Sequence, residues 1–278
     1  MDVSNDGLPC PEVGPWAEEK HSVVSLYAKL FSTGMKSKWD SRVYIELYAG
    51  SGFAKIKRSS RFIAGSPIRA LLLKDPFDKY IFCEREPDSL RALKARVEKL
   101  APSRQVAYIE GDCNERVDSI LEEIPEYSAN RRVLTLCFVD PFDIGIKFKT
   151  LAKLSDRFMD FLVLLALYMD ANRNIENYAK EEAIKIDEFL GSPTWRARWT
   201  KSQHEGVAFP QFLAEEFSKS MENLNYKPQP FYKMKPIRMP ERNVRLYTLA
   251  LFSRNSRAYD FWDEARKYST DQTAFDWS

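Results

Sequence analysis

The chain has 278 residues, of which 44% are hydrophobic and 29% charged, enough for a sizeable core in one large domain or two small ones. Its 42 lysines and arginines nearly balance 40 aspartates and glutamates, and a net charge of +2 neither demands nor excludes a polyanionic partner. The four cysteines are scattered without a CxxC pair and only two histidines accompany them, so no metal site is predicted.

The first residues, 1–14, are polar and proline-bearing, which predicts a mobile arm and does not fit a signal peptide. The longest apolar run, residues 161–169, is too short to cross a bilayer as a helix. We therefore expect a protein of the reducing cytoplasm that makes no membrane contact. Residues 15–278 are predicted to form a single domain.

Strands and helices are predicted to alternate through the first half of this domain. A helix is expected over residues 16–32, followed by strands over 43–48, 79–84, 105–112, 132–141 and 160–168. Helices are expected between them over 66–74, 87–100, 114–124 and 148–156. The fourth and fifth strands are nearly continuous apolar runs, which is typical of strands covered on both faces. The alternation predicts an α/β fold with a doubly wound, Rossmann-like, mostly parallel sheet.

The alternation breaks at residues 171–225, which we expect to form a helical insertion between strands five and six. Two helical stretches, 174–190 and 210–224, flank a connection over residues 191–206. Two further strands, 230–238 and 243–253, are joined by a short connection and predict an antiparallel edge with an antiparallel last strand. A helix over 256–268 follows.

Carboxylates stand at the ends of four successive predicted strands. Strand one ends in Glu46 and a glycine turn over 50–52, and strand two ends in Glu84. Strand three ends in Asp112, and strand four ends in Asp140 and Pro141, followed by Phe142. Because ligands of open α/β sheets bind at the carboxyl ends of the strands, these acids are predicted to form one site.

A nucleoside cofactor fits this cluster, since Glu84 would accept the ribose hydroxyls and Asp112 the adenine amino group. The dinucleotide fingerprint fails because residue 55 is lysine in place of the third glycine, and no P-loop sequence is present. The pattern therefore favours S-adenosylmethionine over NAD. The predicted cofactor-binding residues are Glu46, Tyr48, Ala49, Gly50, Gly52, Glu84, Asp112 and Cys113. The alternatives are a plain tight turn, solvated or helix-capping acids, and a Cys113 that only packs.

Asp140, Pro141 and Phe142 form a candidate catalytic corner. In enzymes that methylate amines, an acid or amide followed by proline and an aromatic residue orients the target amine, and the aromatic ring stacks on an extruded base. The usual form has two prolines and this chain has one. The alternative is an aspartate that caps the next turn, with Phe142 packed beneath it.

Basic residues interleave with tryptophans at residues 195–201, a pattern that suits nucleic acid because cations meet the backbone and rings meet unstacked bases. The predicted substrate-binding residues are Arg196, Arg198, Trp199 and Lys201. Trp195 and Trp199 are four residues apart, however, and as one face of a helix they would belong to the core.

Several short stretches together resemble the three-Cys-motif partner protein family: "YIELYAGSG" (44–52), "GSP" (65–67), "FCE" (82–84), "GDCN" (111–114), "FVDPF" (138–142) and "FLGSPTWR" (189–196). Trp16 and Lys20 also fit, and the resemblance extends over residues 15 to 268. It implies a methyltransferase-type Rossmann domain and a separate three-cysteine protein as a partner. This chain departs from the family in having Glu46 for the usual aspartate and "AGSG" for "AGPG".

The first hypothesis is therefore an S-adenosylmethionine-dependent methyltransferase acting on an amino group of nucleic acid. The second is a partner or binding module that keeps the cofactor fold and transfers nothing. The third is methylation of a small molecule or a protein.

Overall fold

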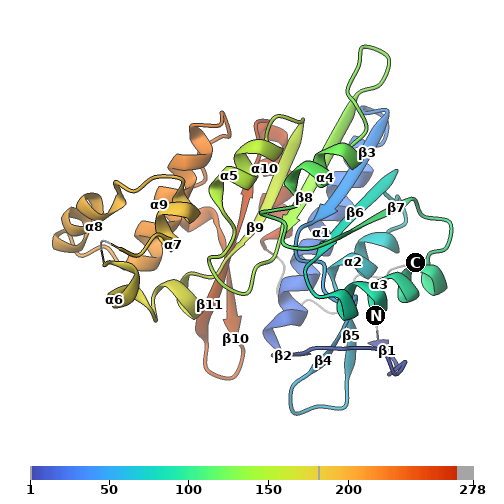
Figure 1. Cartoon of the computed structure of the whole chain (residues 1–278), viewed down its shortest axis with the longest axis horizontal. Helices are drawn as coiled ribbons and strands as arrows, with labels where there is room; N and C mark the ends of the chain where they lie inside the picture. The colour runs from blue at the N-terminus through green and yellow to red at the C-terminus, as the bar shows by residue number, and fades with distance from the viewer. Residues whose placement is uncertain (1, 181, 268–278) are drawn as a thin grey trace.

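The computed structural model describes residues 2–180 and 182–267. A seven-stranded sheet runs through it in the order β10-β11-β9-β8-β3-β6-β7 (Figure 1). Five of its strands are parallel, and β11 lies antiparallel between β9 and β10. The strands are β3 (Ser41–Glu46), β6 (Lys79–Glu84), β7 (Val106–Glu110), β8 (Val133–Val139), β9 (Met159–Leu165), β10 (Lys235–Met239) and β11 (Val244–Phe252). The predicted doubly wound sheet with an antiparallel last strand is confirmed.

Helices cover both faces of the sheet because successive residues of each buried strand point to opposite sides. Val43 and Ile45 face one core, and Tyr44 faces the other. The first core is closed by α4 (Val117–Glu123), α5 (Phe148–Leu154) and the insertion, and the second by α1 (Trp16–Met35), α2 (Ser66–Leu71), α3 (Pro87–Leu100) and α10 (Ser256–Ala265). On the second face Tyr27 of α1 meets Trp262 of α10, with ring centroids 6.1 Å apart.

The insertion contains one helix that the sequence did not predict. After a π-helical turn (Leu167–Ala171) come α6 (Ile175–Tyr178), α7 (Lys185–Leu190), α8 (Trp195–His204) and α9 (Phe209–Glu222). The helix expected over 174–190 is therefore two short helices, with residue 181 outside the described residues. Gly191, in the left-handed region at φ 68°, ends α7, and α8 fills the expected connection.

The N-terminal residues differ from the mobile arm predicted for 1–14. Within residues 2–14, β1 (Asp2–Val3) and β2 (Glu12–Val13) join β4 (Phe53–Ile56) and β5 (Phe62–Ala64) in a second sheet of order β1-β5-β4-β2. Arg96, 2% exposed, donates to both oxygens of Asp6 at 2.8 and 2.7 Å and to the carbonyl of Pro9 at 2.9 Å. A buried guanidinium thus holds a segment whose own composition offers little apolar surface.

The remaining boundaries lie close to their predictions. A 3-10 turn (Phe231–Lys233) precedes β10 where the strand was expected to begin at residue 230. The last predicted helix ends at Ala265, and residues 268–278 of the predicted domain lie outside the described residues. Across residues 2–180 and 182–267, no helix has both the length and the apolar character needed to cross a membrane.

Candidate functional site

The glycine turn after β3 brings open backbone to the carboxyl edge of the sheet. Gly50 (φ 63°) and Gly52 (φ 86°) both lie in the left-handed region that side chains rarely adopt. A Cβ at Gly50 would meet nothing within 4 Å, whereas one at Gly52 would lie 2.8 Å from Leu93. The Gly52 carbonyl accepts the Gly65 amide at 2.7 Å. The turn is therefore fixed at its second glycine and open to a ligand at its first.

Glu84, at the end of β6, is joined directly to this turn. Its Oε2 accepts the Gly50 amide at 2.7 Å, and its Oε1 accepts the Glu86 amide at 2.9 Å. Each oxygen of a carboxylate has two lone-pair sites, so each can accept one further hydrogen. The half-buried carboxylate is thus held in place with capacity for two hydroxyl donors, the requirement of a ribose diol.

Asp112, which follows β7, has one oxygen engaged and one available. Its Oδ1 accepts the Asn114 amide at 2.8 Å, and Oδ2 has no partner within the described part of the chain. Asn114 in turn donates to the Gly145 carbonyl at 3.0 Å and accepts from the Lys147 amide at 2.9 Å. The sequence reading assigned no role to Asn114, which ties the loop after β7 to the loop after β8.

The side chains of Cys113 and Tyr48 are hydrogen-bonded to each other. Cys113 is 1% exposed, and the Tyr48 hydroxyl forms a hydrogen bond with it. Burial raises the pKa of the Cys113 thiol to about 12, and burial likewise raises the pKa of Tyr48 above its ordinary value. Cys113 is therefore a packed, protonated thiol at neutral pH, which matches the structural alternative for this residue.

Glu46 lies beneath the turn, with its side chain turned into the second core. It is 1% exposed, and its two oxygens accept hydrogen bonds from the hydroxyl groups of Ser66 and Tyr44. Burial raises the pKa of Glu46 well above its ordinary value, and the nearby charge of Asp140 raises it further. Its hydrogen bonds join β3 to the start of α2, so Glu46 supports the turn from below.

Asp140, directly after β8, forms an ion pair with Lys20 of α1. Lys20 Nζ lies 2.5 Å from Asp140 Oδ2, and the two side chains are only 14% and 13% exposed. Asp140 Oδ1 has no partner among the residues that the structure describes. Pro141 is buried, whereas Phe142 is 88% exposed, which excludes the alternative in which its ring packs beneath the turn. The corner thus presents one free carboxylate oxygen beside an exposed aromatic ring.

A fifth acid at this edge, Asp170, lies in the π-helical turn after β9 and was not predicted. Its carboxylate accepts from the Ile144 amide at 3.0 Å, the Tyr178 hydroxyl at 2.7 Å and Lys185 Nζ at 3.2 Å. Lys185 also binds Asp143 at 2.8 Å. Burial raises the pKa of Asp170, but these hydrogen bonds and the Lys185 charge outweigh it and leave the pKa below its ordinary value. The network joins the loop that follows Phe142 to the insertion.

Replacing Asp170 by asparagine should therefore destabilise the fold by about 1–3 kcal/mol at neutral pH, because buried donors lose a charged acceptor. Since the folded-state pKa is lowered, this stabilisation is present above the unfolded pKa of about 3.9 and is lost as pH falls through the folded pKa. Urea unfolding at pH 7, at pH 5 and at a series of values below about 3.9 measures the difference in free energy of unfolding between wild type and Asp170→Asn. Glu176→Gln, at an exposed position of α6, is the matched control and should change little at any pH. If wild type were still as much more stable than Asp170→Asn once the pH is below the folded pKa, this role of Asp170 would be contradicted.

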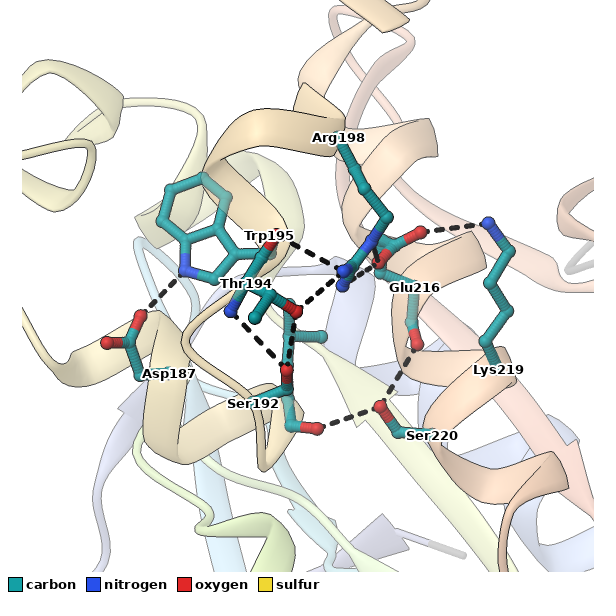
Figure 2. Close-up of polar contacts among 9 residues, drawn as sticks. Asp187, Ser192, Thr194, Trp195, Arg198, Glu216, Lys219 and Ser220 are labelled. Carbon is teal, nitrogen blue, oxygen red and sulfur yellow. Dashed lines mark hydrogen bonds and ion pairs between the residues drawn. The ribbon is translucent and has the colours of Figure 1, made fainter. Parts of the chain in front are cut away.

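The predicted substrate-binding residues lie elsewhere, in α8 at the end of the molecule opposite β3, β6 and β7 (Figure 1). Trp195 is fully buried and donates to Asp187 at 2.7 Å, while Arg198 reaches Glu216 of α9 at 2.6 Å (Figure 2). Arg196 pairs with Asp187 at 2.7 Å. Trp199 is half-buried against Phe209 and Phe212, and Lys201 is exposed. The structure does not bring this segment to the glycine turn, and the core alternative explains Trp195 and Trp199.

Comparisons with known proteins give likenesses of structure only. No family model matches the chain, and no curated protein matches it. A protein of Legionella pneumophila is similar at 12% identity and a TM-score of 0.49, with 88% of this chain and 89% of that one covered. Trm1 from Pyrococcus horikoshii, solved with S-adenosyl-L-methionine, is similar at 11% identity and a TM-score of 0.49, with 94% of this chain and 63% of that one covered. An O-methyltransferase from Bacillus cereus, solved with SAH, is similar at 10% identity and a TM-score of 0.48, with 89% of this chain and 84% of that one covered. The fold is therefore defined by the strand order of the sheet itself, which is mostly parallel and Rossmann-like.

Proposed function

We propose that this chain is an S-adenosylmethionine-dependent methyltransferase that acts on an amino group of a nucleic-acid base. The observation that carries the proposal is the geometry of Glu84. Its carboxylate is fixed by the Gly50 amide at 2.7 Å, beside a turn with free space above it. A carboxylate that keeps two acceptor sites next to open backbone fits a ribose diol and the chain attached to it.

The other groups along the same edge fit the rest of the cofactor. The available Oδ2 of Asp112 would accept the adenine amino group, and the open backbone at Gly50 would receive the amino-acid portion. When bound, S-adenosylmethionine supplies an electrophilic methyl group. Glu46 would act indirectly, because its buried hydrogen bonds keep β3 and α2 in register below the turn.

Asp140 and Phe142 support an amine as the target. With Oδ2 held by Lys20, Oδ1 remains to accept a hydrogen from the amine, which directs the nitrogen lone pair away from the acid. A ring that is 88% exposed at the next corner offers a stacking surface for a planar base removed from its stack. The basic residues of α8 contribute nothing to this argument, because internal ion pairs occupy Arg196 and Arg198.

Asp140→Ala should slow methyl transfer by about 10²-fold or more and change S-adenosylmethionine affinity little, since the acid orients the amine and not the cofactor. Asp140→Asn should recover part of the rate, because an amide oxygen also accepts a hydrogen bond. The measurement is transfer of labelled methyl groups to mixed-sequence single-stranded DNA and RNA, beside calorimetric titration of the cofactor.

The outcomes separate the alternatives. Transfer by Asp140→Ala at the wild-type rate would remove the proposed role of Asp140. If the chain bound the cofactor but methylated only a protein or a small molecule, the methyltransferase assignment would stand and the proposed nucleic-acid substrate would be wrong. No binding of S-adenosylmethionine or S-adenosylhomocysteine, together with capture of a three-cysteine-motif protein, would favour the non-catalytic partner module.

A further inference from the structure

A cavity of about 470 Å³ lies at the edge of the sheet opposite the carboxylates. It opens between the first residues of β8 and β9, the C-terminal part of α1 and the N-terminus of α10. Six residues along β8 separate Leu134 in its wall from Asp140, a distance of roughly 20 Å along a strand. The cavity therefore belongs to a different place from the candidate methyl-transfer site, and its volume lies in the range of small-molecule pockets.

The body of this cavity is apolar and largely aromatic. Its walls include Phe31, Met35, Trp39, Leu134, Phe158 and Phe261. Phe158 is 51% exposed, and its ring lies 5.8 Å from that of Trp39. Exposed aromatic surface of this kind around a concave site favours a ligand with an apolar, ring-sized body.

Cations dominate the polar part of the lining. Lys227 and Arg257 are exposed, and their side chains have no partner within residues 2–180 and 182–267. Arg254 is fixed in place, because it donates to the Ser155 carbonyl at 2.9 Å and lies over the Tyr226 ring at 4.4 Å. The first turn of α10, with the positive pole of the helix, lies at the same rim.

Asp160 is the single acid among the lining residues, and its charge is partly suppressed. It is 8% exposed and hydrogen-bonded to Ser253. Burial raises the pKa of Asp160 to about 7, so near neutral pH a substantial fraction of this carboxyl group is uncharged. Three cations therefore face one partly neutral acid, and the balance of charge at the cavity is positive.

We propose that this cavity binds a small organic anion with an apolar ring-sized body and one carboxylate, sulfonate or phosphate group. The body lies between the aromatic walls, and the anionic group lies at the rim beside Lys227, Arg257 and the start of α10. An organic cation of the same shape is disfavoured by the same charges. The inference is independent of methyl transfer, since no residue that lines the cavity belongs to the glycine turn or to the carboxylate row, Glu46, Glu84, Asp112 and Asp140.

The test uses the full chain and a matched pair of probes, naphthalene-1-acetate and its neutral amide, titrated by calorimetry. We expect one site per chain and binding of the carboxylate several-fold to about tenfold tighter than the amide. Lys227→Glu combined with Arg257→Glu should weaken binding of the carboxylate probe by about tenfold and leave the affinity for the amide probe nearly unchanged. Both positions are exposed, so the fold should persist, as a thermal unfolding curve verifies.

Lys201→Glu, a charge reversal at an exposed position of α8, is the control and should change neither affinity. Saturating S-adenosylmethionine should not displace the probe, which separates this site from the candidate cofactor site. Equal affinity for acid and amide, or insensitivity to the double charge reversal, would overturn the proposal. So would loss of carboxylate affinity in Lys201→Glu, since the attraction would then come from overall charge.

Discussion

Glu84→Ala should weaken binding of S-adenosylmethionine and S-adenosylhomocysteine by about 10- to 100-fold, the loss expected when hydrogen bonds to a charged acceptor are removed. The fold should remain, because Glu84 is half-buried and the amides of Gly50 and Glu86 can turn to water instead. Calorimetric titration of both compounds measures the effect, and circular dichroism verifies the fold.

Two further variants make this result specific to the Glu84 carboxylate. Glu84→Gln keeps the shape and one acceptor oxygen, so its affinity should lie between those of wild type and alanine. Glu86→Ala, two residues on and exposed, should bind like wild type. If Glu84→Ala bound S-adenosylmethionine with unchanged affinity, the ribose assignment would be wrong, and with it the main support for the proposed function.

Trp195→Ala should lower the free energy of unfolding by about 3–5 kcal/mol, the range for truncation of a large buried aromatic side chain. Trp195 is fully buried, contacts Phe209 with ring centroids 6.1 Å apart and donates to Asp187 at 2.7 Å. The substitution leaves a cavity and removes from Asp187 the indole donor that Figure 2 shows. Arg196, at 2.7 Å, remains as a charged partner of Asp187. Urea unfolding followed by circular dichroism gives the value.

Lys201→Ala, on the exposed side of the same helix, is the matched control and should stay within about 0.5 kcal/mol of wild type. The pair also distinguishes the two interpretations of residues 195–201. A nucleic-acid interface predicts that Lys201→Ala weakens oligonucleotide binding while Trp195→Ala leaves stability nearly unchanged. A core helix predicts the reverse, and the burial of Trp195 supports the core helix.

The sheet could be predicted because the burial of its strands is visible as apolar runs in the sequence. β8 and β9 are covered on both faces, so they are apolar at nearly every position and contrast with the polar helices between them. The carboxylate row followed from the same pattern, since parallel strands deliver their ends to one edge. Glu84, Asp112 and Asp140 all lie at that edge in the structure.

The features that escaped prediction depend on contacts between distant residues. Lys20 lies 120 positions before Asp140, and nothing in its own helix marks it as the partner of that acid. Arg96 holds Asp6 across 90 positions, so residues 2–14 have a defined place that their composition does not show. Asp170 lies in a π-helical turn, a geometry that hydrophobic periodicity does not detect.

The packing of α1 against α10 has a consequence for the order in which the protein folds. Tyr27 of α1 is buried against Trp262, so the face of α1 that meets α10 is covered only when residues 256–265 have been synthesised. One edge of β3 likewise stays unpaired until β8 is made, since Glu46 pairs with Phe138. Such long-range pairing slows folding and keeps apolar surface exposed on the nascent chain. Until α10 has been synthesised, the α10-facing side of α1 is thus an apolar surface that a chaperone would have to shield.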